Sequence, residues 1–272
     1  MANNPLNKRS TKGDTALERH YNSHKEDLRL QRRHGVVEFR VSMKFILDYL
    51  PHDRQPSEIK ILDLGAGTGR YTKELMQLGY DVTAVEPIRY NLEVLRKNIP
   101  DAKSYLGNAL NLSFLGDKRF DAVISFGPMY HLISDDDKRK AFAETKNVTK
   151  DGGLIFQAYL LNDYSIISYC FAENRMPELM ARGRVDENFR VHPEANELYD
   201  YVDLETIDSL NAAAGLTRLT IFSPDGPTDF IRPQLNAMDD ATFELFVQYQ
   251  MQRAERPDMI GASSHIVDVL KK

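Results

Sequence analysis

The residues ILDLGAGTGR, numbered 61 to 70, decide the fold of this chain. The first four continue a short apolar run that begins at Ile59, as expected of a buried β-strand. Three glycines at alternate positions follow, and the stretch from Arg70 to Leu78, ended by Gly79, is predicted to be a helix. Such a turn lets the backbone approach a ligand closely and aims helix-terminal N–H groups at it. We therefore predict a ligand-binding strand–turn–helix unit.

The alternation of strand and helix continues downstream of this unit. The pattern predicts strands at 81–85, 104–106, 120–126 and 154–160, with helices at 88–98 and 136–148. Strands that alternate with helices form a parallel sheet covered on both faces, and right-handed crossovers between them produce a doubly wound topology. The predicted fold class is therefore α/β: a Rossmann-like, doubly wound, mostly parallel sheet of about seven strands.

The remaining segments are expected to extend and cover this sheet. Apolar residues recur at helical spacing up to Leu50, which predicts N-terminal helices. After residue 160 the alternation lapses and aromatic and methionine side chains accumulate, which predicts a helical cap beyond the carboxyl end of a strand. Further helices are predicted at 203–214 and 239–255, and strands at 217–222 and 264–270. We expect four parts: a tail and helical lid at 1–50, a ligand-binding core at 51–160, a helical cap insertion at 161–201, and the C-terminal part of the core sheet at 202–272.

The composition argues against several classes of protein. The formal net charge of −5 and the sequence pI of about 5.8 disfavour nucleic acid as a partner. The single cysteine, Cys170, allows no intrachain disulfide. The first residues lack the apolar core of a signal peptide, and the longest apolar run, Leu154–Leu161, is too short to span a bilayer. We expect a cytoplasmic protein without a membrane partner, and the sequence does not indicate its oligomeric state.

An acidic residue, Glu86, ends the second predicted strand. A carboxylate at this position can accept hydrogen bonds from both hydroxyls of a ribose, which indicates a nucleoside ligand. The dinucleotide fingerprint places glycine or alanine three residues after Gly67, where this chain has Arg70. A nucleoside without a pyrophosphate therefore fits the turn better than a dinucleotide does.

Taken together, these motifs resemble those of class I S-adenosylmethionine-dependent methyltransferases of the small-molecule type. The family's first motif matches residues 61–69, and its acidic strand end matches 85–87. Its adenine-contacting loop matches 107–109 and its fourth strand 120–126. The lead-in to its fifth strand matches 150–154. The resemblance implies S-adenosylmethionine as cofactor. It also implies an enzyme that transfers the methyl group of this cofactor to a small-molecule acceptor.

The resemblance implies roles on the methionine and ribose side of the cofactor. Asp63 would lie near the methionine amino group, and Glu86 would take the ribose hydroxyls. The backbone carbonyl of Phe126, beside Gly127, would accept from the methionine ammonium. The turn residues that would pass under the methionine and ribose are Gly65, Ala66, Gly67 and Gly69.

On the adenine side, the resemblance places Pro87 and Ile88 against the ring face, and Ala109 at the ring itself. Asn108 would read the adenine amino group. Families of this kind more often have aspartate there, but an amide oxygen can also accept from that group. Tyr21, on an N-terminal lid, would close over the cofactor.

Candidate catalytic residues follow the fourth predicted strand, where such families place groups that face the acceptor. Tyr130 and His131 are these candidates, and a purely structural role for His131 is the alternative. Asp135–Asp137 is interpreted as a helix N-terminus, so no metal site is predicted. Pocket candidates in the cap are Tyr164, Met176, Met180 and Tyr199, with Arg175, Arg182 or Arg184 available for an acidic group on the acceptor.

Three other functions stay open at this point, and one of them is the transfer of another group of S-adenosylmethionine, such as its aminocarboxypropyl arm. An NAD-dependent oxidoreductase would share the glycine turn and Glu86, although it would leave Arg70 and the loop 107–109 unexplained. A protein that binds S-adenosylmethionine without turnover would share every motif. The sequence identifies neither the acceptor molecule nor its acceptor atom.

Overall fold

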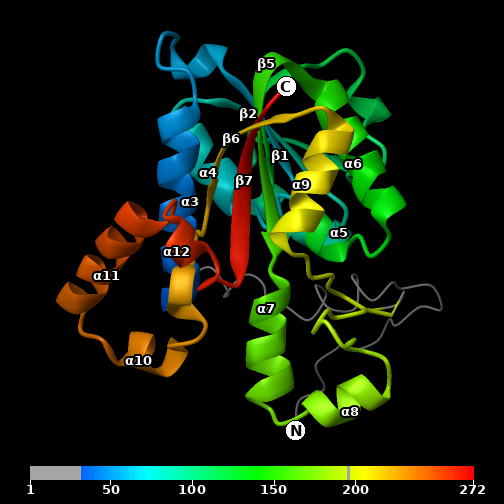
Figure 1. The fold of residues 1–272 in the computed structure, drawn as a ribbon. Coiled ribbons are helices and arrows are strands. Elements are labelled where there is room, and N and C mark those ends of the chain that lie inside the picture. Colours follow the sequence, from blue (N-terminus) through cyan, green and yellow to red (C-terminus); the bar gives the residue numbers. More distant parts are fainter. Residues whose placement is uncertain (1–31, 195–196) are drawn as a thin grey trace, which may run out of the picture.

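A computed structural model describes residues 32–194 and 197–272 (Figure 1). Of the predicted tail and lid at 1–50, residues 1–31, which include Tyr21 and Arg29, lie outside the described residues. The seven strands form one sheet in the order β3-β2-β1-β4-β5-β7-β6. Their bounds are β1 (Lys60–Leu64), β2 (Asp81–Glu86), β3 (Lys103–Leu106), β4 (Phe120–Ser125), β5 (Thr149–Leu160), β6 (Thr217–Phe222) and β7 (His265–Lys271).

The prediction of a doubly wound, mostly parallel sheet is confirmed. Strands β1 to β5 pair in parallel, and the strand order reverses direction at β1, which lies between β2 and β4. Each predicted strand is present. The strand β5 begins earlier than expected, because Thr149 pairs with Phe120 before the pairing resumes at Leu154.

Helices cover both faces of the sheet, as Figure 1 shows. The helices α3 (Arg33–Tyr49), α4 (Arg70–Gln77) and α11 (Asp240–Arg253) contribute to one buried cluster with the sheet, and α6 (Asp135–Val148) and α9 (Leu204–Ala214) to the other. The helix α5 (Arg89–Asn98) links β2 to β3. Because both faces are covered, the central strands are apolar on both sides; β4, for example, is buried along its whole length.

The last strand runs against the others. β7 pairs antiparallel with β5 on one side and with β6 on the other, in a register that sets His265 opposite Leu160. The amino end of β7 therefore lies at the same edge of the sheet as the carboxyl ends of the parallel strands. This edge is where open α/β sheets bind ligands.

The cap is only partly helical. Helices α7 (Asn162–Ser165) and α8 (Met176–Ala181), with the π-helix Ile166–Phe171 between them, lie beyond the carboxyl end of β5 (Figure 1). The helical prediction is wrong at residues 182–194 and 197–201, where the chain is irregular. There the Asp186 carboxylate accepts from the backbone N–H groups of Asn188 and Arg190, a local bond that competes with helix formation.

Two short helices complete the described part of the chain. α10 (Arg232–Ala237) and α12 (Pro257–Ile260) flank α11 and were not predicted. Within residues 32–194 and 197–272, no helix combines the length and the apolar character needed to cross a membrane.

Candidate active site

The glycine turn after β1 is held tightly against neighbouring strands. The backbone N–H groups of Gly65 and Ala66 both donate to the carbonyl of Val85, at 2.8 and 3.1 Å. Gly65 has a φ of +81°, and a Cβ built on it would lie 3.0 Å from Cδ of Pro128, so only glycine fits there. A Cβ on Gly67 would meet no heavy atom within 4 Å. The turn therefore presents an open side at Gly67.

Glu86 is buried at the end of β2 and organises this turn. Its Oε2 accepts from the Gly67 N–H at 2.8 Å, and its Oε1 accepts from the Ile88 N–H at 2.9 Å and from Nδ2 of Asn91 at 3.2 Å. Burial raises the pKa of Glu86, and these hydrogen bonds oppose the rise. Glu86, the residue predicted to bind the ribose, is thus in direct contact with the predicted glycine turn.

Asp63, near the carboxyl end of β1, is buried. Its side chain is 2% exposed, and its Oδ2 accepts from the Thr72 hydroxyl at 2.6 Å. Burial raises the pKa of Asp63 to about 6. In this structure the carboxylate ties β1 to α4.

The predicted adenine residues lie along the next two strand ends. The Gly107 N–H donates to the backbone carbonyl of Glu86 at 3.2 Å, which brings the loop after β3 against β2. Asn108 is exposed and its Oδ1 accepts from the Leu110 N–H, whereas Ala109 is buried in the core. Pro87 is half-buried.

The segment after β4 joins the glycine turn to a second region. The carbonyl oxygen of Phe126 lies 3.7 Å from the position of a Cβ on Gly65, so the two predicted cofactor residues are neighbours. Gly127 precedes a short 3-10 helix, Pro128–His131, that carries both catalytic candidates.

Those two candidates point to different surroundings. Tyr130 lines a cavity of about 160 Å³. His131 does not line it: its Nδ1 lies 2.8 Å from the carbonyl oxygen of Leu198, and its ring contacts the Tyr199 ring at 5.4 Å between centroids. The two rings are nevertheless 6.1 Å apart between centroids, and Tyr199, which the His131 ring contacts, also lines the cavity.

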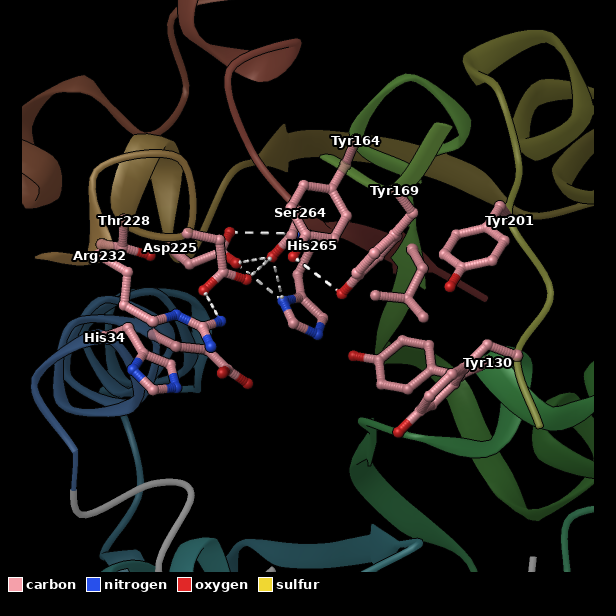
Figure 2. Close-up of a pocket in the computed structure, with 14 residues that line it drawn as sticks. His34, Tyr130, Tyr164, Tyr169, Tyr201, Asp225, Thr228, Arg232, Ser264 and His265 are labelled. Carbon is pink, nitrogen blue, oxygen red and sulfur yellow. Dashed lines mark hydrogen bonds and ion pairs between the residues drawn. The ribbon is translucent and has the colours of Figure 1, made fainter. Parts of the chain in front are cut away.

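The cavity lies between the cap and the C-terminal third of the chain, and Figure 2 shows its lining. One wall is aromatic and the other is polar. The aromatic wall consists of Tyr130, Tyr164, Tyr169, Tyr199 and Tyr201. The remaining lining residues are His34, Glu38, Leu160, Asp225, Thr228, Asp229, Arg232, Ser264 and His265.

Ionisation within the lining follows from burial. Burial raises the pKa of Tyr164 strongly and that of Tyr201 to about 12, so both phenols stay neutral hydrogen-bond donors. Burial disfavours the charged form of Asp229, but the Arg232 guanidinium, which donates to its Oδ1, holds the pKa of that carboxyl below its ordinary value. The cavity thus contains neutral tyrosine side chains beside the ion pair of Asp229 and Arg232.

The cap candidates are divided by the structure. Tyr164 and Tyr199 line the cavity, Met176 is buried in a small cluster with Cys170, and Met180 is exposed. The three arginines line a separate hollow of about 440 Å³, which shares Tyr169, Tyr199 and Tyr201 with the first. Ion pairs there join Arg175 to Glu173, Arg182 to Glu178, and Arg184 to Glu194 and Glu197.

The polar wall of the cavity was not predicted. Asp225 and Asp229 follow β6, Ser264 immediately precedes β7, and His265 begins it. A signal was available in the sequence: polar residues gather at 223–229 and 263–265, at the ends of two predicted strands. They indicate a site only if the last strand is antiparallel, because then both segments reach the carboxyl edge of the sheet.

Comparisons with known proteins agree with this geometry. A family model described as a methyltransferase domain matches residues 62–157. An uncharacterized methyltransferase of Mycobacterium tuberculosis is 39% identical over 94 residues, which cover 35% of this chain and 37% of the relative. A demethylmenaquinone methyltransferase of Paenarthrobacter aurescens is 41% identical over 95 residues, covering 35% of this chain and 36% of the relative. The matches thus span little more than a third of these relatives.

The fold itself matches over almost the whole chain. A crystal structure from Thermotoga maritima, described as a SAM-dependent methyltransferase and possible histamine N-methyltransferase, superimposes with a TM-score of 0.57. The match covers 94% of this chain and 98% of that chain at 17% sequence identity, which establishes similarity of fold alone.

Proposed function

From the premise that this chain carries a class I S-adenosylmethionine-dependent methyltransferase domain, we propose that it transfers a methyl group from S-adenosylmethionine to a small-molecule acceptor. One observation carries the proposal. The buried carboxylate of Glu86 holds the Gly67 N–H at the carboxyl edge of the sheet, and the tyrosine-lined cavity lies at the same edge. This arrangement supports a nucleoside site and an acceptor site at one edge of the sheet.

The residues at the turn fit the cofactor. The open side of Gly67 leaves room for a ligand, and the Glu86 oxygens beside it are acceptors of the kind that ribose hydroxyls need. The Phe126 carbonyl, close to Gly65, is an acceptor suited to an ammonium group. The sulfonium of the bound cofactor supplies a methyl group with a good leaving group. We propose the following cofactor-binding residues: Gly65, Ala66, Gly67, Gly69, Glu86, Pro87, Asn108, Ala109, Phe126 and Gly127, with Asp63 supporting the turn and Tyr21 closing over it.

The cavity supports a small acceptor. Its volume of about 160 Å³ is close to that of a cavity of roughly 150 Å³ that binds benzene in another protein, so it admits a ring-sized group. The name of the demethylmenaquinone methyltransferase denotes a small-molecule substrate, which agrees with this size. The net charge of −5 disfavours nucleic acid, and the single cysteine agrees with a cytoplasmic site of action.

Binding measurements test the proposal directly. Calorimetry on the full chain should detect S-adenosylhomocysteine and S-adenosylmethionine but neither NAD nor NADP. A screen of small acceptors, followed by release of S-adenosylhomocysteine, should then identify turnover. Tight binding of NAD without binding of S-adenosylhomocysteine would sink the proposal.

A further inference from the structure

A histidine–aspartate pair, neither of whose residues belongs to the cofactor motifs, lies at the polar wall of the cavity. The Nδ1 of His265 lies 2.8 Å from Oδ2 of Asp225. The side chains are 15% and 4% exposed, respectively, so the pair is shielded from bulk water. Figure 2 shows the His265 ring entering the cavity with its other nitrogen, Nε2, directed toward the tyrosines.

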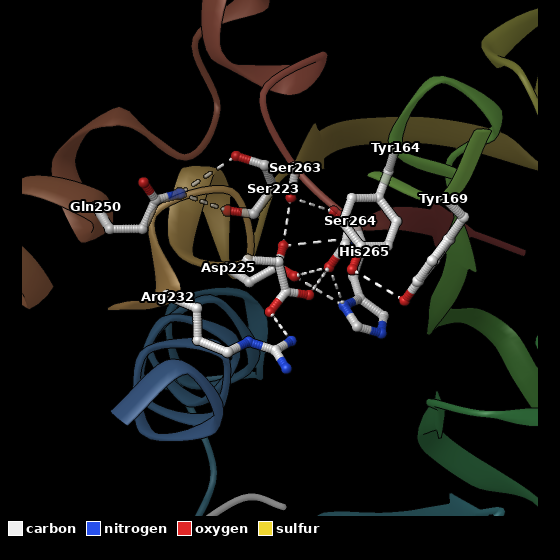
Figure 3. A network of polar contacts seen from close by, with 10 residues as sticks. Tyr164, Tyr169, Ser223, Asp225, Arg232, Gln250, Ser263, Ser264 and His265 are labelled. Carbon is white, nitrogen blue, oxygen red and sulfur yellow. Dashed lines mark hydrogen bonds and ion pairs between the residues drawn. The ribbon is translucent and has the colours of Figure 1, made fainter. Parts of the chain in front are cut away.

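Asp225 is fixed on all sides, as Figure 3 shows. The Ser263 hydroxyl donates to its Oδ1 and the Ser264 hydroxyl to its Oδ2, and the His265 backbone N–H lies 3.3 Å from Oδ1. A carboxylate with these donors accepts only, so the proton on Nδ1 of His265 points to Asp225. The neutral imidazole then carries its lone pair on Nε2, which is the arrangement that a base requires.

We propose that His265 is the general base of methyl transfer, that Asp225 is its positioning residue, and that the acceptor is a ring-sized molecule with a hydroxyl group. This inference rests on the proposed function. A hydroxyl group is the acceptor that such a base serves, because its oxygen must lose a proton as it is methylated, whereas a neutral amine attacks with its own lone pair. Oδ1 of Asp229 accepts from Arg232, and the Ser264 hydroxyl oxygen lies 2.9 Å from its Oδ2.

The hydroxyl oxygen of the acceptor forms a bond to the transferred methyl carbon while the bond from that carbon to sulfur breaks, and its electron pair stays on sulfur. S-adenosylhomocysteine and the methyl ether are the products. The hydroxyl proton passes to Nε2 of His265, and the Asp225 carboxylate stabilises the imidazolium that forms. The imidazolium later releases this proton to solvent.

Several ionisable groups surround His265 and set its pH response. The loop after β6 contributes Asp225 and Asp229 to the cavity, and helix α10 contributes Arg232. The segment after β4 contributes Tyr130, and α3 contributes His34 and Glu38. The cap contributes four tyrosines: Tyr164, Tyr169, Tyr199 and Tyr201. The Tyr130 and His265 rings are 5.5 Å apart between centroids. Tyr130 thus connects the cavity to the strand end that carries Phe126.

Nitrogen NMR of the full chain, labelled in its histidines and saturated with S-adenosylhomocysteine, tests the base without an acceptor. His265, assigned with the H265N variant, should be protonated at Nδ1 and unprotonated at Nε2 in its neutral form. The D225N variant should shift the ring toward the opposite tautomer. A wild-type ring protonated at Nε2 would overturn the proposal, even if D225N failed to fold.

Kinetics with catechol as the hydroxyl probe and benzylamine as the amine probe test the acceptor class. Catechol should be methylated in preference to benzylamine; the reverse preference, or turnover of neither, overturns this class. H265N should lower kcat for catechol by roughly 10²–10⁴-fold and should remove the loss of rate at low pH. H192N is the matched control, because His192 forms a similar pair with Asp186 at 2.9 Å outside the cavity.

Affinity for S-adenosylhomocysteine separates the two proposals. In H265N it should stay within about twofold of wild type, since His265 lies outside the cofactor motifs. Failure of wild type to bind S-adenosylhomocysteine would count against the proposed function. Binding with an unchanged kcat in H265N would count against the base alone.

Discussion

Glu86 combines two roles that are usually discussed separately, ligand binding and support of the backbone. Its carboxylate accepts from the Ile88 N–H and from Nδ2 of Asn91 in buried bonds and from the Gly67 N–H in a part-buried one, so its removal leaves three donors without this partner. We expect E86A to weaken S-adenosylhomocysteine binding by roughly 10–150-fold and to lower the free energy of unfolding by about 1–3 kcal/mol.

Calorimetry and urea unfolding measure these two effects in the same preparation. E93A, on the exposed side of α5, is the control and should change neither quantity. An affinity within twofold of wild type for E86A would refute the ribose assignment.

Asp63 makes a pH-dependent contribution to stability. Burial raises its pKa from 3.8 to about 6, so between these values the unfolded chain releases the proton while the folded chain keeps it. The stability that Asp63 contributes is therefore fully present below pH 3.8, the pKa in the unfolded chain, and is lost as the pH rises to about 6, the pKa in the folded chain. D63N cannot ionise, so it should gain stability over wild type across this window, by on the order of 3 kcal/mol.

Urea unfolding of D63N and wild type at a series of pH values measures this difference. Asp121 provides the contrast: burial opposes its charge, but hydrogen bonds from Lys150, the Lys60 N–H and Arg54 lower its pKa. D121N should therefore lose stability at neutral pH, and the deficit should shrink as the pH falls. A stability difference between D63N and wild type that does not vary with pH would contradict the assignment.

At the scale of elements, helix α11 supports the loop that carries Asp225. Gln250 on this helix donates to the Ser223 carbonyl at 2.8 Å, and a Cβ on Gly226 would lie 2.2 Å from its Oε1. Gly226 also has a φ of +53°. We expect G226A to lower the free energy of unfolding by about 1–3 kcal/mol, since the added methyl group overpacks this contact.

G226A should also shift the His265 side-chain nitrogen resonances, because the loop and Asp225 move together. Gly261 is the matched control: a Cβ there meets nothing within 4 Å and its φ is ordinary, so G261A should leave both measurements unchanged. Equal stability of the two variants would show that the packing against Gln250 is unimportant.

A second link between elements is the buried Asp268 on β7. Its carboxylate accepts from Arg218 on β6 at 2.7 and 2.8 Å and from Asn211 on α9 at 2.5 Å. We expect D268A to lower the free energy of unfolding by about 3–5 kcal/mol, because it leaves Arg218 without its buried partner. D258A, which removes an exposed pair with Arg256, should cost at most about 1 kcal/mol, and similar losses for both variants would contradict the role of burial.

For the whole molecule, the relation between cap and sheet decides what the enzyme accepts. Tyr169 lines both hollows of the cap and is 41% exposed, so Y169A should raise KM for the acceptor or lower kcat with little change in Tm or in S-adenosylhomocysteine affinity. Met176 packs in a separate buried cluster, so M176A should lower Tm first. Steady-state kinetics and thermal unfolding distinguish these outcomes, and the reverse pattern would mean that the pocket has been misplaced.

Local pattern was sufficient for much of this protein. The strands around residues 61–69 and 81–86, the helices that follow them and the position of Glu86 all depend on residues close in sequence, whose apolar spacing and glycines specify backbone geometry. The contact between Glu86 and the glycine turn could be expected for the same reason, since both end adjacent parallel strands.

The polar wall of the cavity depended on contacts between distant segments. His265 and Asp225 are separated by 40 residues, and they meet because β7 inserts antiparallel between β5 and β6. The hydrophobic pattern of a single strand does not predict its direction in the sheet or which strand lies next to it, because hydrogen bonds to other strands set both. His131 was chosen from its place in the chain, whereas its side chain is directed to Leu198 and Tyr199.

By itself, therefore, the sequence determined the fold class, the strand–turn–helix unit and the family resemblance, all of which follow from short-range geometry. Only the tertiary structure decided which side chains share the cavity, where the irregular half of the cap runs, and that Asp63 faces the core. The physical reason is that register and strand direction arise from pairing and packing between segments far apart in the chain, and these interactions become definite only when the whole sheet has assembled.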